Sequence, residues 1–157
     1  MSRRKSDELH TKRSREEQGP PKDIIKEPLH YTSHKYQPFD IYRDWLLNPW
    51  VSNSIKYICR YRDKSDPALD LRKAAQYIRE QVEDMKSDNV LTRICAKPMF
   101  KHDVRTVGVV ELCEDWGLNE EMSEVLRLIY FGWFDNNIEY FKRASEALDK
   151  ESTGWTL

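Results

Sequence analysis

Asn53 to Tyr77, NSIKYICRYRDKSDPALDLRKAAQY, is the stretch of sequence that decides the fold we expect. On a helix with 3.6 residues per turn, side chains that follow one another at intervals of three or four residues lie along one side. At this interval the segment places a polar and mostly cationic stripe, made of Asn53, Lys56, Tyr57, Arg60 and Lys64. The opposite side is apolar and carries Val51, Ile55, Ile58 and Cys59. The segment therefore predicts an amphipathic helix that is packed on one side.

A second helix is expected after a short turn. Asp66 and Pro67 are typical of a helix start, because aspartate caps free amides and proline fits the first helical position. Apolar residues then recur at helical spacing and should be core: Leu71, Ala74, Ala75, Ile78, Val82 and Met85. A polar stripe lies beside them, with Asp70, Lys73, Tyr77 and Asp84. The short turn predicts an antiparallel hairpin, which brings Asp70 near Arg60 and Lys64.

The rest of the chain also favours helices. We expect a short helix over residues 39–47 and C-terminal helices over residues 104–150, whereas residues 90–95 fit either a short helix or a strand. Capping residues that should open helices are Asn48, Asp103, Asn119 and Asp135,. Little of the chain is left for a sheet, so the sequence predicts an all-α, compact domain of about six helices built on the hairpin. Its expected core contains Trp45, Ile55, Ile58, Leu71, Ile78, Leu112, Leu126, Ile129 and Phe141.

Length and composition fit one domain. The chain has 157 residues, of which 39% are hydrophobic, enough for one modest core,. Residues 1–26 are charged and lack apolar periodicity, so we expect a disordered tail before a single helical domain over residues 27–150 and a frayed end over residues 151–157. The net charge of −1 argues against general binding of nucleic acid,. Weak contact through basic clusters of the tail, such as Arg3-Arg4-Lys5, is the exception,.

The cysteines and the hydropathy bear on location. Three cysteines without Cys-x-x-Cys spacing, and without an export signal, fit a reducing cytoplasm, that of the host cell if the protein is viral,. Cys59 and Cys113 lie on apolar helix sides and should be small core residues,. Because no apolar run approaches the roughly 20 residues that span a bilayer, we expect no membrane partner.

The cationic stripe has two interpretations. Amide, ammonium, phenol and guanidinium groups together suit a phosphate-bearing partner, because they combine positive charge, forked donors and a stacking surface. The simpler interpretation is a solvated side of a packed helix. Asp70 also has two interpretations. It forms a structural ion pair with Arg60, or it is a carboxylate beside cations where a metal–nucleotide binds.

Several short motifs follow one another along the chain, each present once: His30-Tyr31, Pro38-Phe39-Asp40-Ile41, Ser52 to Arg60, Lys64, Asp70 to Ala74, and Tyr77. This order resembles the SaV-like family of small phage proteins, many of them described as nucleotide kinases. That family typically has His-Tyr, a short helix, Gly-Asn-x-x-Lys-Tyr-x-x-Arg, Lys, and Asp-Leu-x-Lys-Ala-x-x-Tyr. The resemblance covers about residues 30–83. Ser52 replaces the glycine before Asn53, which adds bulk and a hydroxyl group,.

The resemblance implies a nucleotide-binding protein that phosphorylates nucleoside or deoxynucleoside monophosphates with a triphosphate donor, ATP, and Mg²⁺. A P-loop is excluded, because the chain has only five glycines and no Gly-x-x-x-x-Gly-Lys-Ser/Thr motif,. Phosphoryl transfer mainly requires positioning and stabilised charge, so Lys56 and Arg60 are candidates to hold phosphate oxygens and Asp70 to hold magnesium. The candidates for substrate binding are His30, Tyr31, Asn53, Tyr57, Lys64, Lys73 and Tyr77.

Two alternatives remain open. The first is a non-enzymatic phage early protein that binds a nucleotide or a host protein through the same helix side. The second is an all-α, magnesium-dependent nucleoside triphosphate pyrophosphohydrolase, which gathers carboxylates from facing helices; the pairs Glu80-x-x-Glu83 and Glu111-x-x-Glu114 would then converge,. The oligomeric state is open, a homo-oligomer included.

Overall fold

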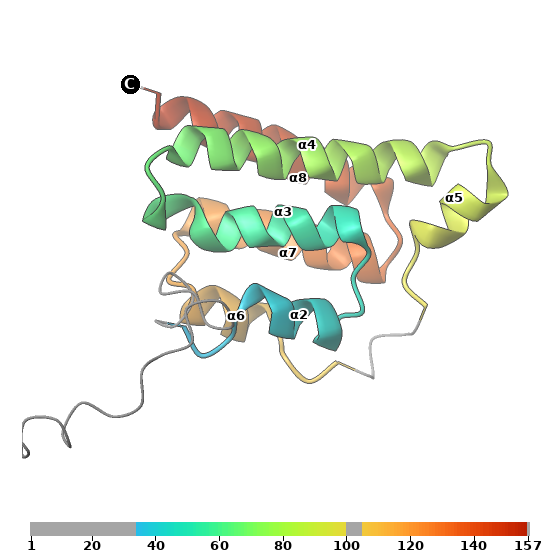
Figure 1. The fold of residues 1–157 in the computed structure, drawn as a ribbon, viewed down its shortest axis with the longest axis horizontal. Coiled ribbons are helices and arrows are strands. Elements are labelled where there is room, and N and C mark those ends of the chain that lie inside the picture. The colour runs from blue at the N-terminus through green and yellow to red at the C-terminus, as the bar shows by residue number, and fades with distance from the viewer. Residues whose placement is uncertain (1–33, 100–104, 157) are drawn as a thin grey trace, which may run out of the picture.

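The structure of the chain is a computed structural model, which describes residues 34–99 and 105–156 (Figure 1). Within those residues it contains no strand, and its α-helices are α2 (Pro38–Asp44), α3 (Pro49–Arg60), α4 (Pro67–Lys86), α5 (Val90–Cys95), α6 (Val109–Asp115), α7 (Glu120–Phe134) and α8 (Ile138–Gly154). The all-α prediction is confirmed, and the open segment 90–95 is a helix. The predicted disordered tail, residues 1–26, lies outside the described residues. None of the helices described has the length and apolar character of a membrane span.

Four long helices form the centre of the molecule. Helix α4 packs on α3 along one side and on α8 along another, and α7 packs on α8 and α3. Figure 1 shows α3 and α4 running antiparallel, α2 and α6 beyond α3 and α7, and α5 standing off the end of α4. The predicted hairpin is therefore confirmed, with the 3₁₀ turn η1 (Tyr61–Asp63) in its connection.

Local capping explains where several helices begin. The Asn48 side chain accepts a hydrogen bond from the Val51 amide at 3.0 Å, and Pro49 follows as the first helical residue. Asp66 accepts from the Leu69 amide at 3.0 Å in the same way. Asn119 opens α7 by accepting from Met122 at 2.8 Å. Each cap satisfies an amide that the helix itself leaves free, and these three predicted starts are confirmed.

Two predicted starts are wrong. Helix α6 begins at Val109 after Gly108 rather than at Asp103, which lies outside the described residues. The segment before it is held in another way, because the amides of Thr106 and Val107 donate to the Asp44 carboxylate at 2.9 and 2.8 Å. Helix α8 is capped by Asn137, whereas Asp135 is the C-cap of α7.

Two predicted ends also differ. Helix α2 ends at Asp44 rather than near residue 47, because Leu46 takes a left-handed backbone with φ of 51°. Helix α8 continues past Glu151 to Gly154, so the predicted fraying over residues 151–157 is wrong as far as the helix extends. Trp155 follows as its C-cap and packs edge-on against Tyr61, with ring centroids 5.9 Å apart. This contact ties the end of α8 to the turn of the hairpin.

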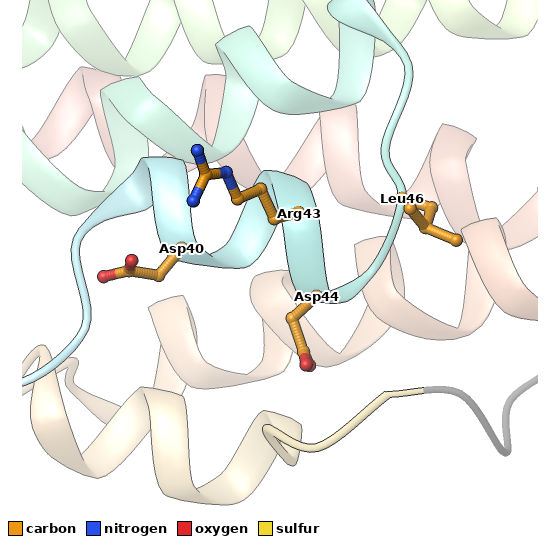
Figure 2. Close-up of a pocket in the computed structure, with 4 residues that line it drawn as sticks. All are labelled: Asp40, Arg43, Asp44 and Leu46. Atoms are coloured by element: carbon orange, nitrogen blue, oxygen red, sulfur yellow. The ribbon is translucent and has the colours of Figure 1, made fainter.

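Helix α2 forms a small layer on one side of the bundle. Figure 2 shows Asp40, Arg43 and Asp44 on this helix and Leu46 beyond its end; together they line a pocket of about 350 Å³. Asp44 is already occupied, since it also accepts from the Thr106 hydroxyl at 2.6 Å. The carboxylate therefore works as an anchor between α2 and the segment that enters α6.

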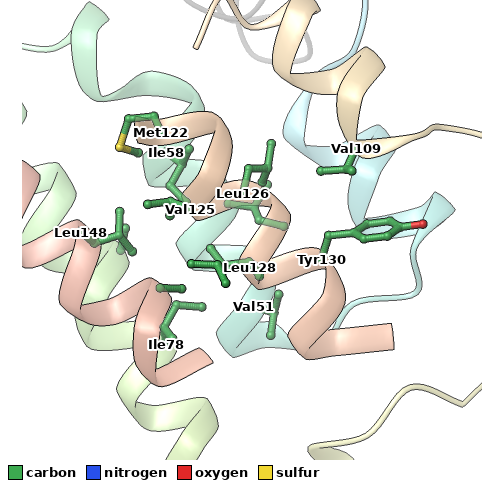
Figure 3. Packing of buried hydrophobic residues seen from close by; sticks show 14 of the residues in the cluster. Val51, Ile58, Ile78, Val109, Met122, Val125, Leu126, Leu128, Tyr130 and Leu148 are labelled. Carbon is green, nitrogen blue, oxygen red and sulfur yellow. The ribbon is translucent and has the colours of Figure 1, made fainter. Parts of the chain in front are cut away.

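The core lies where α3, α4, α7 and α8 meet (Figure 3). All nine side chains predicted for it are buried, as are the thiols of Cys59 and Cys113. Gly132 allows α7 and α8 to approach closely, because a Cβ there would lie 3.1 Å from the Phe141 ring. Buried indoles keep partners: Trp45 Nε1 donates to the Val107 carbonyl at 2.9 Å,. The apolar sides of the helices thus face inward, and the polar side of α3 lies along its contact with α4.

Candidate functional site

Two polar helix sides meet where α3 and α4 pack together. We call this line of contact the α3–α4 seam. Its members on α3 are Trp50, Asn53, Lys56, Tyr57 and Arg60, and its members on α4 are Asp70, Lys73, Tyr77 and Asp84. Because α3 and α4 are antiparallel, the end of α3 lies opposite the start of α4. The seam therefore brings together residues that lie up to 34 positions apart in the sequence.

At the turn end of the seam, Arg60 and Asp70 form a nearly buried ion pair. Arg60 Nε lies 3.4 Å from Asp70 Oδ2, and the two side chains are 21% and 7% exposed. Neither of these two atoms takes part in a hydrogen bond within the described part of the chain. Asp70 lies in the first turn of α4, where the helix dipole favours a carboxylate,. The predicted proximity of Arg60 and Asp70 is confirmed.

Next to this pair, three cations surround the ring of Tyr57. The distances from the Tyr57 ring centroid are 4.5 Å to Arg60 Cζ, 4.9 Å to Lys56 Nζ and 5.5 Å to Lys73 Nζ. A cation within about 6 Å of an aromatic face is attracted by the ring quadrupole. With Asp70 as the neighbouring carboxylate, this end of the seam carries more positive than negative charge.

Aromatic rings continue the seam away from the turn. Tyr57 stacks on Tyr77, with centroids 5.9 Å apart and planes at 13°, and Tyr77 lies 6.1 Å from Trp50 at 34°. At the far end, Trp50 Nε1 donates to Asp84 Oδ2 at 2.6 Å. Asp84 belongs to the polar stripe predicted for α4, but neither Asp84 nor Trp50 is among the residues predicted for the site. Helical spacing could have indicated both residues, since Trp50 lies three residues before Asn53 and Asp84 lies seven residues after Tyr77.

Not every predicted residue lies on the seam. Helix α3 ends at Arg60 and η1 follows, so Lys64 is exposed beyond the helix with an extended backbone; its predicted place on the stripe is wrong. Asn53 lies on the predicted side, and its amide donates to the Pro49 carbonyl at 2.9 Å. Ser52 is a partly exposed residue of α3. His30 and Tyr31 lie outside the described residues.

Asp70 is the seam residue that the sequence proposes as a magnesium ligand, and its surroundings bear on that proposal. Among the described residues, no three histidine, cysteine or acidic side chains gather closely enough to hold a metal. Asp70 is a single carboxylate, and Arg60 already lies against its Oδ2. Magnesium usually combines one or two carboxylates with waters and substrate phosphates. Asp70 as a magnesium ligand therefore stays a prediction, and the structure adds its contact with Arg60.

The carboxylate pairs of the pyrophosphohydrolase alternative do not converge. Glu80 on α4 accepts a hydrogen bond from Gln76 on the same helix at 2.8 Å. Glu111 on α6 accepts from the Tyr36 hydroxyl at 2.5 Å and lies 3.7 Å from Lys35. One pair lies on α4 and the other on α6, and among the described residues no three acidic, histidine or cysteine side chains gather as a metal site would require, so the predicted grouping of these carboxylates is wrong.

Two pockets lined by described residues suit phosphate less well than the seam does. A pocket of about 880 Å³ between α7 and α8 is lined by one lysine, Lys150, and four glutamates, Glu120, Glu121, Glu124 and Glu151. Such a surface repels an anion. The pocket on α2 has two aspartates and one arginine, and Arg43 lies 4.2 Å over the Phe39 ring. Neither of these two pockets has the excess of positive charge that the seam carries.

Comparison with known proteins gives one match. A family model described as a protein of unknown function (DUF3310) matches residues 25–79. The match includes all of α3, the hairpin turn and α4 as far as Arg79, so it contains the ion pair and the cations around Tyr57 but not Asp84. No curated protein and no solved structure matches the chain. The matched residues overlap the region that carries the SaV-like pattern, and the description assigns them no function.

Proposed function

We propose that the chain binds nucleotides through the α3–α4 seam, with Lys56, Arg60 and Lys73 receiving the phosphate groups. The observation that carries this proposal is the gathering of these three cations around the Tyr57 ring, all within 5.5 Å of its centroid. Three like charges held together repel one another, and an anion between them removes that repulsion. Lys56 and Lys73 form no ion pair with another described residue, so both ammonium groups are available to a ligand.

Asp70 has a supporting role in this proposal. By lying against Arg60 Nε at 3.4 Å, it fixes one edge of the guanidinium group while the side chain stays 21% exposed. The planar guanidinium carries further donors on its terminal nitrogens, and a fixed plane suits forked binding to phosphate. Asp70 is then a positioning residue that acts through Arg60, rather than a metal ligand.

The finer activity that we propose is phosphorylation of nucleoside or deoxynucleoside monophosphates, with ATP as donor, as the resemblance implies. Phosphoryl transfer requires little covalent help from a protein, and clustered cations supply the charge stabilisation that it needs. Magnesium enters this proposal only as part of the metal–nucleotide substrate. The alternative is nucleotide binding without turnover, and the engagement of Asp70 by Arg60 favours it.

Titration with Mg–ATP and with each monophosphate tests nucleotide binding. Lys73→Ala should weaken binding at least about tenfold, since hydrogen bonds between charged groups contribute about 1.5–3 kcal/mol. Arg72→Ala is the matched control, because it removes the same charge from the neighbouring exposed residue of α4, outside the seam. Equal losses in the two variants would show that only general charge matters, and would overturn the proposed site.

Nucleotide chromatography separates the activities. A kinase converts ATP and a monophosphate into two diphosphates in equal amounts. A pyrophosphohydrolase releases pyrophosphate from one triphosphate, and a binding protein leaves every nucleotide unchanged while its melting temperature rises with ligand. Binding at the seam without diphosphate formation across all natural monophosphates would replace the kinase with the non-enzymatic alternative.

A further inference from the structure

We propose that the Trp50–Asp84 end of the seam receives the nucleobase, and that Asp84 selects bases that carry an exocyclic amino group. This inference rests on the proposed function, because it requires the phosphate to lie among the cations around Tyr57. It adds an orientation for the ligand and a residue that determines specificity. Both follow from the order in which the side chains lie along the seam.

The seam is chemically asymmetric along its length. Cations cluster around Tyr57 near the turn, Tyr77 lies in the middle, and Trp50 with Asp84 forms the far end. Trp50 and Tyr57 are two helical turns apart on α3, which corresponds to a rise of roughly 10 Å. That length is comparable to an extended nucleoside monophosphate. A phosphate at the cationic end therefore leaves the base beside Trp50 and Tyr77, whose partly exposed rings offer a stacking surface,.

Asp84 gives this end a preference among bases. An ionised carboxylate only accepts hydrogen bonds, and Asp84 Oδ2 already accepts from Trp50 Nε1 at 2.6 Å,. The side chain is partly exposed, and its other oxygen, Oδ1, accepts no hydrogen bond from another described residue. An exocyclic amino group can donate to that oxygen, whereas an exocyclic carbonyl oxygen in the same place would face it as a second acceptor. Adenine, cytosine and guanine carry such an amino group, and uracil, thymine and hypoxanthine do not.

The hydrogen bond between Trp50 and Asp84 holds both side chains in a fixed orientation. The indole is held at its Nε1 by Asp84 and lies against Tyr77. Its ring plane is therefore set before a ligand arrives, so little conformational freedom is lost on binding. The same hydrogen bond orients the Asp84 carboxylate, which places Oδ1 at a defined position next to the stacking surface.

The test compares ligands that differ at one exocyclic group. The wild-type protein should bind adenosine monophosphate about tenfold more tightly than inosine monophosphate, and cytidine monophosphate more tightly than uridine monophosphate, as expected for one charge-assisted hydrogen bond. In Asp84→Asn the amide oxygen can still accept from Trp50 while its amino group faces the base. That variant should therefore reverse the preference in both pairs. Glu83→Gln, which alters the neighbouring exposed carboxylate of α4, should keep the wild-type preference.

Ribose 5-phosphate separates this inference from the proposed function, because it carries phosphate without a base. It should bind equally to the wild type and to Asp84→Asn. Binding of all four monophosphates with equal affinity, together with loss of binding in Lys73→Ala, would overturn the role of Asp84 and leave the phosphate site standing. A wild-type protein that binds none of these ligands would overturn both proposals. An Asp84→Asn variant with a lower melting temperature but an unchanged base preference would show that the Trp50–Asp84 bond is structural only.

Discussion

The α3–α4 seam and the contact between α7 and α8 join helices in different ways. Around Gly132 the contact between α7 and α8 is apolar and close, because Gly132 admits the Phe141 ring and Phe141 is fully buried. Between α3 and α4 the contact includes the Arg60–Asp70 ion pair and the cations around Tyr57. Both pairs of helices are antiparallel and neighbours in one bundle. The bundle therefore does not require charged groups to hold a helix pair together.

This difference indicates what the polar seam is for. Replacing a nearly buried ion pair with apolar side chains of similar size is often neutral or stabilising, since charges lose hydration when they are buried. The Asp70 side chain is only 7% exposed, yet its closest contact with Arg60, from Oδ2 to Nε, is not a hydrogen bond. A seam selected for stability alone would resemble the contact between α7 and α8. We therefore attribute its cations to a ligand, and the following predictions compare the two regions.

The largest expected effect lies in the apolar region. Phe141→Ala should lower the free energy of unfolding by about 3–5 kcal/mol, because it removes a fully buried ring and leaves a cavity,. Urea denaturation followed by circular dichroism measures this change. Nucleotide affinity per folded molecule should stay at the wild-type value. A loss below about 1 kcal/mol would mean that this contact does not hold the bundle.

The ion pair should give an intermediate effect that depends on how it is removed. Arg60→Ala should cost about 1–3 kcal/mol of stability, since Asp70 is left nearly buried without its partner,. The double variant Arg60→Met/Asp70→Leu should regain most of that loss, because no unpaired charge remains. Both variants should lose nucleotide affinity. A double variant that unfolds as readily as Arg60→Ala, while binding nucleotide normally, would make the pair purely structural.

A pH-dependent effect is expected on the core side of α3. Burial raises the pKa of the Cys59 thiol from its ordinary value of 9.0 to about 12. The unfolded chain then loses this proton at a lower pH than the folded protein, so the associated stability is complete below pH 9 and is lost as pH rises from 9 toward 12,. At pH 10 the loss should be about 1.4 kcal/mol relative to neutral pH. Denaturation curves of wild type and Cys59→Ala at both pH values isolate it; identical pH dependence would contradict the prediction.

The smallest effect belongs to an exposed ion pair that joins α4 to α8. Arg79 Nη1 lies 2.7 Å from Asp149 Oδ2, but the two side chains are 43% and 48% exposed. Solvent screens such a pair, so Arg79→Ala should change the free energy of unfolding by less than about 1 kcal/mol. A thermal melt in low salt and in high salt measures it. A larger loss that persists in high salt would show that surface pairs, rather than the apolar contact, join these helices.

Local signals made much of the fold predictable. The caps at Asn48, Asp66 and Asn119 act within a few residues of themselves, so the sequence is sufficient to place them. Asp135 was the wrong choice among three adjacent residues that all suit a cap. Asp135 keeps a helical backbone as the C-cap of α7, Asn136 is left-handed with φ of 50°, and Asn137 has the extended backbone that an N-cap requires,. Nothing local predicts that Asp44 would capture the amides before α6.

The candidate site was predictable as far as helical spacing extends. Spacing placed Tyr57, Lys73 and Tyr77 correctly, and the short turn placed Arg60 beside Asp70. Helical spacing gave the wrong place for Lys64, because α3 ends four residues earlier at Arg60 and its periodicity no longer applies there. The bond between Trp50 and Asp84 was missed for another reason: it depends on the register between two helices, which the pattern of either helix alone does not contain.

The most direct test of the central claim is the affinity of Lys56→Ala for Mg–ATP. Lys56 forms no ion pair with another described residue, and its Nζ lies 4.9 Å from the centroid of the Tyr57 ring, so the substitution should change stability by less than about 1 kcal/mol,. Lys142→Ala on α8, which breaks an exposed pair with Glu139, is the matched control. We predict that Lys56→Ala binds Mg–ATP at least about tenfold more weakly than wild type while Lys142→Ala binds normally. Unchanged affinity in Lys56→Ala, or no binding by the wild type, would contradict a phosphate site on the α3–α4 seam.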